Sequence, residues 1–307
     1  MLRAVSSNSR REGSLDQRII DLYDRFTHGQ LDRREFMERL ATLAGSVAAA
    51  SALLPALMND YARAAIVEDN DPRLEITMAS YESGGATVKG YLVRARRVAA
   101  KRPGVIVIHE NRGLNPHIKD VTRRMALAGY LAFGVDFLSV DGGTPENEDR
   151  GREMIAALDR PTTVMRAVDA VTFLAAHPDS TGAVGAVGFC WGGAMLNLLA
   201  EASPELKAGV AYYGMQPPLE RVADIKAALL LHYAGLDNRI NEGIPAYEDA
   251  LKKAGTDYTI YVYEGANHAF NNDTSPTRFD PAAAELAWGR TLDFFAKHLG
   301  APPPVET

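Results

Sequence analysis

The 307-residue sequence contains one cysteine, Cys190, and only two tryptophans. A single cysteine excludes an internal disulfide and a multi-cysteine metal site. The seven histidines show no metal-ligand spacing such as HExxH, so we expect neither a metal nor a cofactor. Neither sign of charge is in large excess, because the formal net charge is only -6. This balance argues against a nucleic-acid-binding surface.

Long apolar runs are equally scarce. The longest, residues 40–57, is dominated by alanine, so we expect no transmembrane helix. The chain is nevertheless 47% hydrophobic, enough to bury a large core in one catalytic domain. From residue 79 onward, short apolar strands alternate with helical patterns. This alternation predicts an α/β fold with a mostly parallel sheet covered by helices on both faces. The expected strands are 88–93, 105–109, 130–135, 184–188, 208–213, 228–233 and 258–263, and the expected helices are 118–128, 161–177, 194–202, 245–254 and 281–299.

The hexapeptide Gly188-Phe189-Cys190-Trp191-Gly192-Gly193 lies between a predicted strand and a predicted helix. This is the layout of a nucleophile elbow, in which a sharp turn exposes the nucleophile and small flanking residues avoid a clash. The alternative is a buried structural cysteine on a glycine-rich turn.

An acid and a histidine follow in the order that an α/β-hydrolase requires. Asp237 comes after the strand 228–233, and His268 comes after the strand 258–263. The order nucleophile, acid, base differs from that of chymotrypsin and subtilisin. Taken alone, Asp237 could be a helix cap and His268 an ordinary loop histidine, but with the elbow they favour a Cys-Asp-His triad.

Together these motifs resemble the dienelactone hydrolase family over about residues 91–295. A further match is the early strand 105–109 followed by Glu110-Asn111-Arg112-Gly113. The resemblance implies the α/β-hydrolase fold and an ester- or lactone-cleaving activity. It also implies that Glu110 holds the resting cysteine as a neutral thiol, and that the backbone N–H of Asn111 is one oxyanion donor.

The residue types suggest the remaining roles. His268 would act as the base for Cys190, and Asp237 would fix the imidazole tautomer. The backbone N–H of Trp191, at the start of the following helix, would supply the other oxyanion donor. Glu110 has a structural alternative, a salt bridge to a residue such as Arg112.

The substrate is expected to be a small ester or lactone. The two arginines that would clamp the carboxylate of dienelactone in the family are not in place, so we consider Arg112 and Tyr213 as substrate-binding residues instead. An acyltransferase or thioesterase with the same triad, and a non-catalytic binding protein of the same fold, are the alternatives. The oligomeric state stays open.

Residues 1–64 form an extension to the catalytic domain of residues 65–307. Arg33-Arg34-Glu35-Phe36-Met37 resembles a twin-arginine export motif, and Ala62-Arg63-Ala64 offers a cleavage site. The long amphipathic stretch 15–26 ahead of it favours instead a helical arm on the mature protein. Periplasmic and cytoplasmic locations therefore both stay open.

Overall fold

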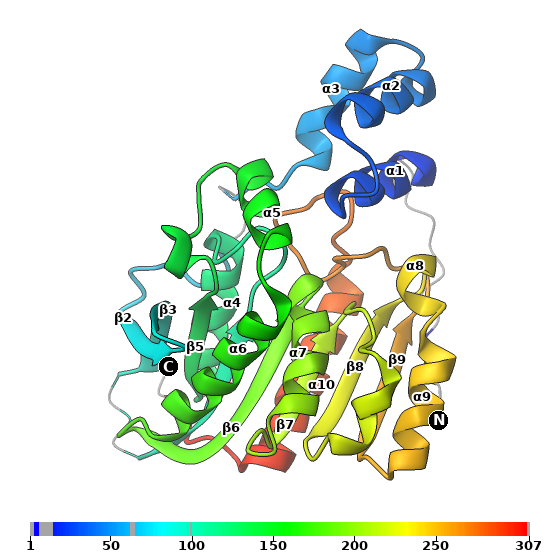
Figure 1. The fold of residues 1–307 in the computed structure, drawn as a ribbon. Helices are drawn as coiled ribbons and strands as arrows, with labels where there is room; N and C mark the ends of the chain where they lie inside the picture. Colours follow the sequence, from blue (N-terminus) through cyan, green and yellow to red (C-terminus); the bar gives the residue numbers. More distant parts are fainter. Residues whose placement is uncertain (1–2, 6–14, 62–64, 97, 99, 306–307) are drawn as a thin grey trace.

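A computed structural model describes residues 3–5, 15–61, 65–96, 98 and 100–305. Its centre is a nine-stranded sheet with the strand order β1-β9-β8-β7-β6-β4-β5-β3-β2 (Figure 1). All neighbours pair in parallel except β2 with β3 and β3 with β5, which are antiparallel. The strands are β1 (Arg3–Val5), β2 (Leu74–Ser83), β3 (Ala86–Ala95), β4 (Arg102–Ile108), β5 (Leu131–Asp136), β6 (Ser180–Phe189), β7 (Ala208–Tyr212), β8 (Ala228–Ala234) and β9 (Tyr258–Tyr263).

Helices cover both faces of this sheet (Figure 1). Two separate apolar clusters fill the space between sheet and helices, one including α6, α7 and α9 and the other including α4 and α10. The body helices are α4 (Pro116–Leu127), α5 (Glu148–Ala156), α6 (Arg160–Ala175), α7 (Trp191–Ala202), α8 (Asn238–Asn241), α9 (Ile244–Ala254) and α10 (Pro281–Leu299), with short 3-10 turns at Ser139–Asp141 and Leu219–Asp224.

The central strands β4, β7 and β8 are buried along their whole length. Parallel strands covered on both faces lose contact with water on both sides, which is why these segments are apolar without alternation. The predicted α/β architecture is confirmed, and all seven expected strands are present: 258–263 has the predicted ends, and the other six have at least one shifted end. Strands β1 and β2 were not predicted.

Three further helices form a lobe over one end of the sheet (Figure 1). They are α1 (Gln17–Thr27), α2 (Arg33–Ala44) and α3 (Val47–Leu57). Their apolar faces pack on one another as a cluster of their own, in which the rings of Phe26 and Phe36 stack with centroids 4.5 Å apart. Side chains of Asp16, Asp32 and Ser46 cap the three helix N-termini. An N-terminal helical segment is therefore present, while the possible cleavage site at residues 62–64 lies outside the described residues.

Within the described parts of the chain, no single helix has the length and apolar composition to cross a membrane. Only α2 and α3 taken together meet those two criteria, and they are bent by 108° at their junction.

Candidate active site

The thiol of Cys190 lies at a strained turn between β6 and α7. Cys190 has φ 55° and ψ -113°, a backbone conformation that few non-glycine residues adopt. The turn is tight because β4 passes close to it. A Cβ on Gly192 would lie 2.4 Å from the carbonyl oxygen of Ile108, and one on Gly188 would lie 2.1 Å from that of Gly192. These contacts explain the glycines of the hexapeptide.

The loops after β8 and β9 bring Asp237 and His268 together. Nδ1 of His268 lies 2.5 Å from Oδ2 of Asp237, and both side chains are buried. Because a carboxylate only accepts, Nδ1 carries the proton and Nε2 is left as the basic nitrogen. That Nε2 has no hydrogen-bond partner among the described residues. The acid and the histidine identified in the sequence thus form a couple with its basic nitrogen free.

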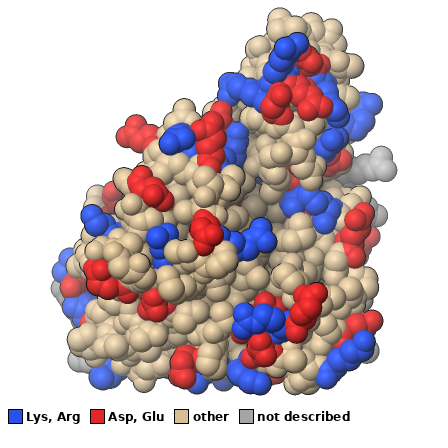
Figure 2. Space-filling model, viewed as in Figure 1, with Lys and Arg blue, Asp and Glu red and all other residues tan. Residues whose placement is uncertain are grey.

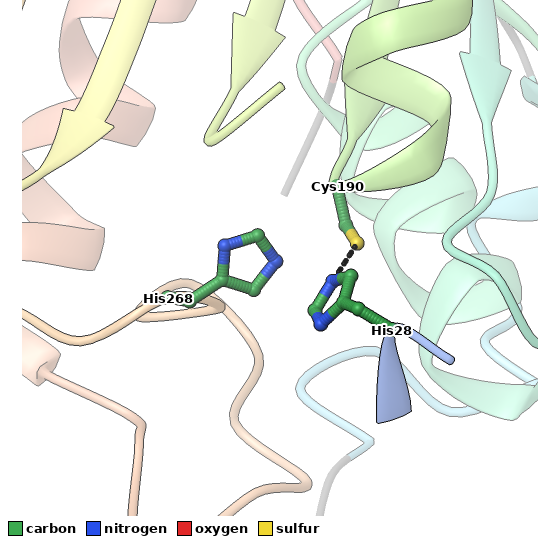
Figure 3. A group of neighbouring side chains, drawn as sticks. All are labelled: His28, Cys190 and His268. Carbon is green, nitrogen blue, oxygen red and sulfur yellow. Dashed lines mark hydrogen bonds between the residues drawn. The ribbon is translucent and has the colours of Figure 1, made fainter. Parts of the chain in front are cut away.

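A second imidazole, which the sequence analysis did not assign, contacts the thiol. Nε2 of His28 lies 3.2 Å from Sγ of Cys190. His28 follows the last turn of α1, and its ring meets that of His268 edge-on with centroids 4.7 Å apart. Figure 3 shows the thiol pointing toward these two rings, which come from opposite ends of the chain. The only signal in the sequence was a histidine at the end of an amphipathic helix, which does not reveal where that helix docks.

The charges around the thiol favour its ionised form. Burial raises the pKa of Cys190, but positive charge on His28 and His268 outweighs burial and lowers that pKa to about 6. Burial lowers the pKa of His268, yet the negative charges of Asp24, Asp237 and Cys190 hold it well above its ordinary value. The pKa of His28 is likewise raised, since Cys190 and Asp24 outweigh the effect of burial. The three groups therefore favour a thiolate with a nearby imidazolium.

Glu110 is buried just past β4. Its Oε2 accepts a hydrogen bond of 2.9 Å from Nδ2 of Asn272 and lies 4.0 Å from Arg112. Its Oε1 has no hydrogen-bond partner among the described residues. Arg112 also pairs with Glu148 at 3.1 Å, so two carboxylates offset its charge. The contact with Arg112 is the structural alternative considered for Glu110, and the effect of Glu110 on the thiol stays a prediction.

The expected oxyanion donors lie on the same cavity as the thiol. Trp191 is the first residue of α7, where backbone N–H groups have no intrahelical acceptor. Asn111 lies in the loop after β4, and its side chain donates a 2.8 Å hydrogen bond to the carbonyl of Thr27. Tyr213 also lines the cavity. Burial raises the pKa of Tyr213, and its protonated hydroxyl has no partner among the described residues.

The cavity has a volume of about 810 Å³ and lies between the helical lobe and the body. Residues 26–33 form one wall, and Cys190, Trp191 and Tyr213 contribute to the other. Figure 2 shows the surface hollowed where the lobe meets the body, with acidic and basic side chains interspersed over this face. Tyr213 lines this cavity, whereas Arg112 is not among the described residues that do.

Side-chain donor atoms of histidine, cysteine and aspartate gather at the site in two groups. The ligand atoms of His28, Cys190 and His268 all lie within 4.8 Å of one another. Thiolate and imidazole are ligands that zinc accepts. A second group joins Asp24, Asp237 and His268.

A model of the dienelactone hydrolase family matches residues 88–299 of the chain. The protein belongs to this family. Members of the dienelactone hydrolase family share the α/β-hydrolase fold seen here, and this chain is a hydrolase acting on ester bonds. A second model, described as YqhI-like, matches residues 8–45. That match includes α1, His28 and α2, all of which lie outside the match to the dienelactone hydrolase family.

Individual relatives agree with this assignment. A protein of Escherichia coli O157:H7 named "Putative carboxymethylenebutenolidase" is 32% identical over 249 residues, which are 76% of this chain and 92% of that protein. "Protein usf" of Aquifex pyrophilus is 31% identical over 235 residues, 72% of this chain and 98% of that protein. A solved structure titled "Putative Dienelactone Hydrolase", from Klebsiella pneumoniae, superposes with a TM-score of 0.67 at 27% identity, covering 73% of this chain and 99% of the other.

Proposed function

We propose that the protein cleaves a small ester or lactone through an acyl-enzyme on Cys190. His268 is the general base and acid of the reaction, and Asp237 orients it. The observation that carries the proposal is the His268–Asp237 couple, whose free Nε2 faces the cavity onto which the strained elbow presents the thiol. Geometry and residue types match those of a nucleophile, a base and an orienting acid.

Acylation begins when Sγ attacks the carbonyl carbon of the substrate. The C–S bond forms, and the oxygen gains a negative charge, whose stabilisation we assign to the backbone N–H groups of Asn111 and Trp191. When the C–O bond breaks, an imidazolium gives its proton to the departing oxygen. Because thiolate leaves a tetrahedral intermediate more readily than alkoxide does, this nucleophile suits substrates with good leaving groups, such as enol lactones and activated esters.

Deacylation needs a water molecule and a neutral imidazole. His268 accepts a proton from water, the resulting hydroxide attacks the thioester carbon, and the C–S bond breaks to release the acid. Glu110, whose Oε1 has no hydrogen-bond partner among the described residues, is proposed to hold the resting cysteine as a neutral thiol by repelling the thiolate. Tyr213 is proposed to donate a hydrogen bond to the substrate from the wall of the cavity. Arg112 is proposed to act indirectly, through its ion pair with Glu110.

A transferase that uses the same acyl-enzyme is the second candidate. The size of the cavity, about 810 Å³, leaves room for an acceptor larger than water. Product analysis with and without an added alcohol or thiol separates the two. Acid alone in both reactions identifies a hydrolase, whereas a new ester or thioester identifies a transferase.

The replacement of Cys190 tests the mechanism. We expect Cys190→Ala to reduce the hydrolysis of p-nitrophenyl esters, lactones or enol lactones by about a thousandfold or more, by analogy with the deletion of other triad nucleophiles. Cys190→Ser is the matched variant, and it should keep a trace of activity because a hydroxyl has a much higher pKa than a thiol. Thermal melting checks that both variants are folded. Turnover by Cys190→Ala close to that of the unmodified protein would refute the acyl-enzyme.

A further inference from the structure

We propose that His28 is a further catalytic residue of this site, a second base that the N-terminal helix α1 places on the nucleophile. The inference rests on the proposed role of Cys190, and it adds a group that lies outside the part of the chain matched by the dienelactone hydrolase family. On this view, residues 15–61 are a part of the active site and are retained in the active enzyme.

The hydrogen-bonding pattern fixes the chemical role of the ring. Nδ1 of His28 lies 2.7 Å from the carbonyl oxygen of Asp24, one turn earlier in the chain. A carbonyl only accepts, so Nδ1 carries a proton and Nε2 presents its lone pair to the thiol of Cys190 at 3.2 Å. His28 thus has the same tautomer as His268. The basic nitrogen of each ring lies close to Sγ of Cys190.

The surroundings favour a positive charge on this ring. His28 lies at the C-terminal end of α1, where the helix dipole stabilises a cation. The Asp24 carboxylate lies 3.3 Å from Nδ1, and Arg239 in turn lies 3.6 Å from that carboxylate. The other titratable groups that face the ring are Cys190 and His268. With the ring only 15% exposed, these contacts are little screened by water.

The lobe is joined to the two loops that carry the proposed chemistry. Asn111, the expected oxyanion residue, donates its side-chain hydrogen bond to the carbonyl of Thr27. Gln17, at the start of α1, donates a 2.5 Å hydrogen bond to Asn267, which precedes His268. The contact between His28 and the thiol is therefore one of several that hold α1 against the site.

Two bases allow the proton transfers to be divided. The thiol proton moves from Sγ to Nε2 of His28, which leaves a thiolate and an imidazolium. The thiolate attacks the ester carbon, and the imidazolium returns that proton to the departing alkoxide. Once that proton has left with the alkoxide, His268 is neutral and can accept a proton from water. When the thioester breaks, that proton passes to the leaving sulfur, which restores the starting state.

Alkylation of Cys190 by iodoacetamide tests this proposal without requiring turnover, and the label is unambiguous because the chain has no other cysteine. The rate is measured from pH 5 to pH 9 for the unmodified protein, His28→Gln, Asp24→Asn and the control His177→Gln, whose histidine lies far from the site at the end of α6. Circular dichroism and limited proteolysis check that the lobe stays docked.

We expect the unmodified protein and His177→Gln to show an alkylation midpoint near pH 6. In His28→Gln the midpoint should move to higher pH, so that alkylation at pH 6.5 falls on the order of tenfold. Asp24→Asn keeps the imidazole, and its midpoint should move the same way by less. Turnover should fall through kcat rather than KM. If His28→Gln loosens the lobe, the alkylation midpoint of Asp24→Asn decides whether His28 lowers the pKa of the thiol.

Unchanged alkylation profiles in both variants would overturn the role of His28. The result for Cys190→Ala is independent of this outcome. Loss of turnover in Cys190→Ala, together with unshifted alkylation in the His28 and Asp24 variants, would retain the acyl-enzyme and reject the second base.

Discussion

At the scale of single residues, two kinds of group are expected to set the reactivity of the Cys190 thiol. His28 and His268 offer basic nitrogens, and they lower the pKa of the thiol. Glu110 is a buried carboxylate whose Oε1 has no hydrogen-bond partner among the described residues. A carboxylate beside a thiol has the opposite effect to an imidazolium, because it repels the thiolate and raises the pKa. The balance between these groups decides how reactive the resting enzyme is toward alkylating agents and oxidants.

The replacement Glu110→Gln tests how far the Glu110 carboxylate raises the pKa of the Cys190 thiol. If Glu110 suppresses the resting thiolate, the variant should have an alkylation midpoint at lower pH than the unmodified protein, so that iodoacetamide alkylates it about two- to tenfold faster at pH 5, while ester turnover falls. Glu148→Gln is the matched control, since it removes the other carboxylate partner of Arg112. Alkylation rates of Glu110→Gln equal to those of the unmodified protein at every pH from 5 to 9 would limit Glu110 to holding Asn272 and Arg112.

The sequence predicted Cys190, Asp237 and His268 as site residues, but it did not predict His28. Cys190, Asp237 and His268 each follow a recognisable strand, and parallel strands end at the same edge of the sheet, so their convergence follows from the fold. His28 lies 162 positions from Cys190 and precedes every described strand of the sheet except β1. Its place depends on how α1 packs against two loops, and no periodicity in the sequence encodes that packing.

At the scale of elements, the elbow depends on how closely β4, β6 and α7 approach one another. The seven predicted strands are apolar, which made them recognisable. β2 was missed because its pairing with β3 leaves several of its side chains exposed at the edge of the sheet. Its sequence, LEITMASYES, therefore lacks the continuous apolar character of the central strands.

Gly192→Ala tests this close approach. Its Cβ would lie 2.4 Å from the carbonyl oxygen of Ile108 and 2.5 Å from that of His109, and backbone atoms cannot rotate away. We expect a loss of about 1–3 kcal/mol or more in the free energy of unfolding, together with loss of turnover. The control is Gly289→Ala in α10, where a Cβ meets nothing within 4 Å. That change should stabilise the helix by about 0.5–1 kcal/mol. Urea denaturation measures both, and equal midpoints would show that β4 and α7 can separate.

At the scale of the whole molecule, the question is whether the lobe of α1–α3 remains on the enzyme. The twin arginines Arg33 and Arg34 begin α2, and Arg33 forms a 2.7 Å ion pair with Asp149 of the body. The guanidinium of Arg152 lies 4.6 Å from the ring centroid of Phe26, and that of Arg278 lies 5.3 Å from the ring centroid of Tyr23. These contacts favour a docked arm, and the proposed role of His28 requires one.

Two measurements decide between an arm and a removable signal. If the arm is retained, protein recovered from the native host begins at Met1 or Leu2, and a protein that begins at Ala65 turns over ester no faster than His28→Gln. That shortened protein should also melt at a lower temperature, because the surfaces that α1 covers become exposed, at a cost of about 1.5–3 kcal/mol for each large apolar side chain that loses its cover.

If the segment is an export signal, the native N-terminus lies near Ala65 and the shortened protein matches the full chain in turnover. Arg33→Lys combined with Arg34→Lys would then block export, whereas an arm predicts unchanged localisation. A native terminus near Ala65 would remove His28 from the active enzyme, and with it the second base.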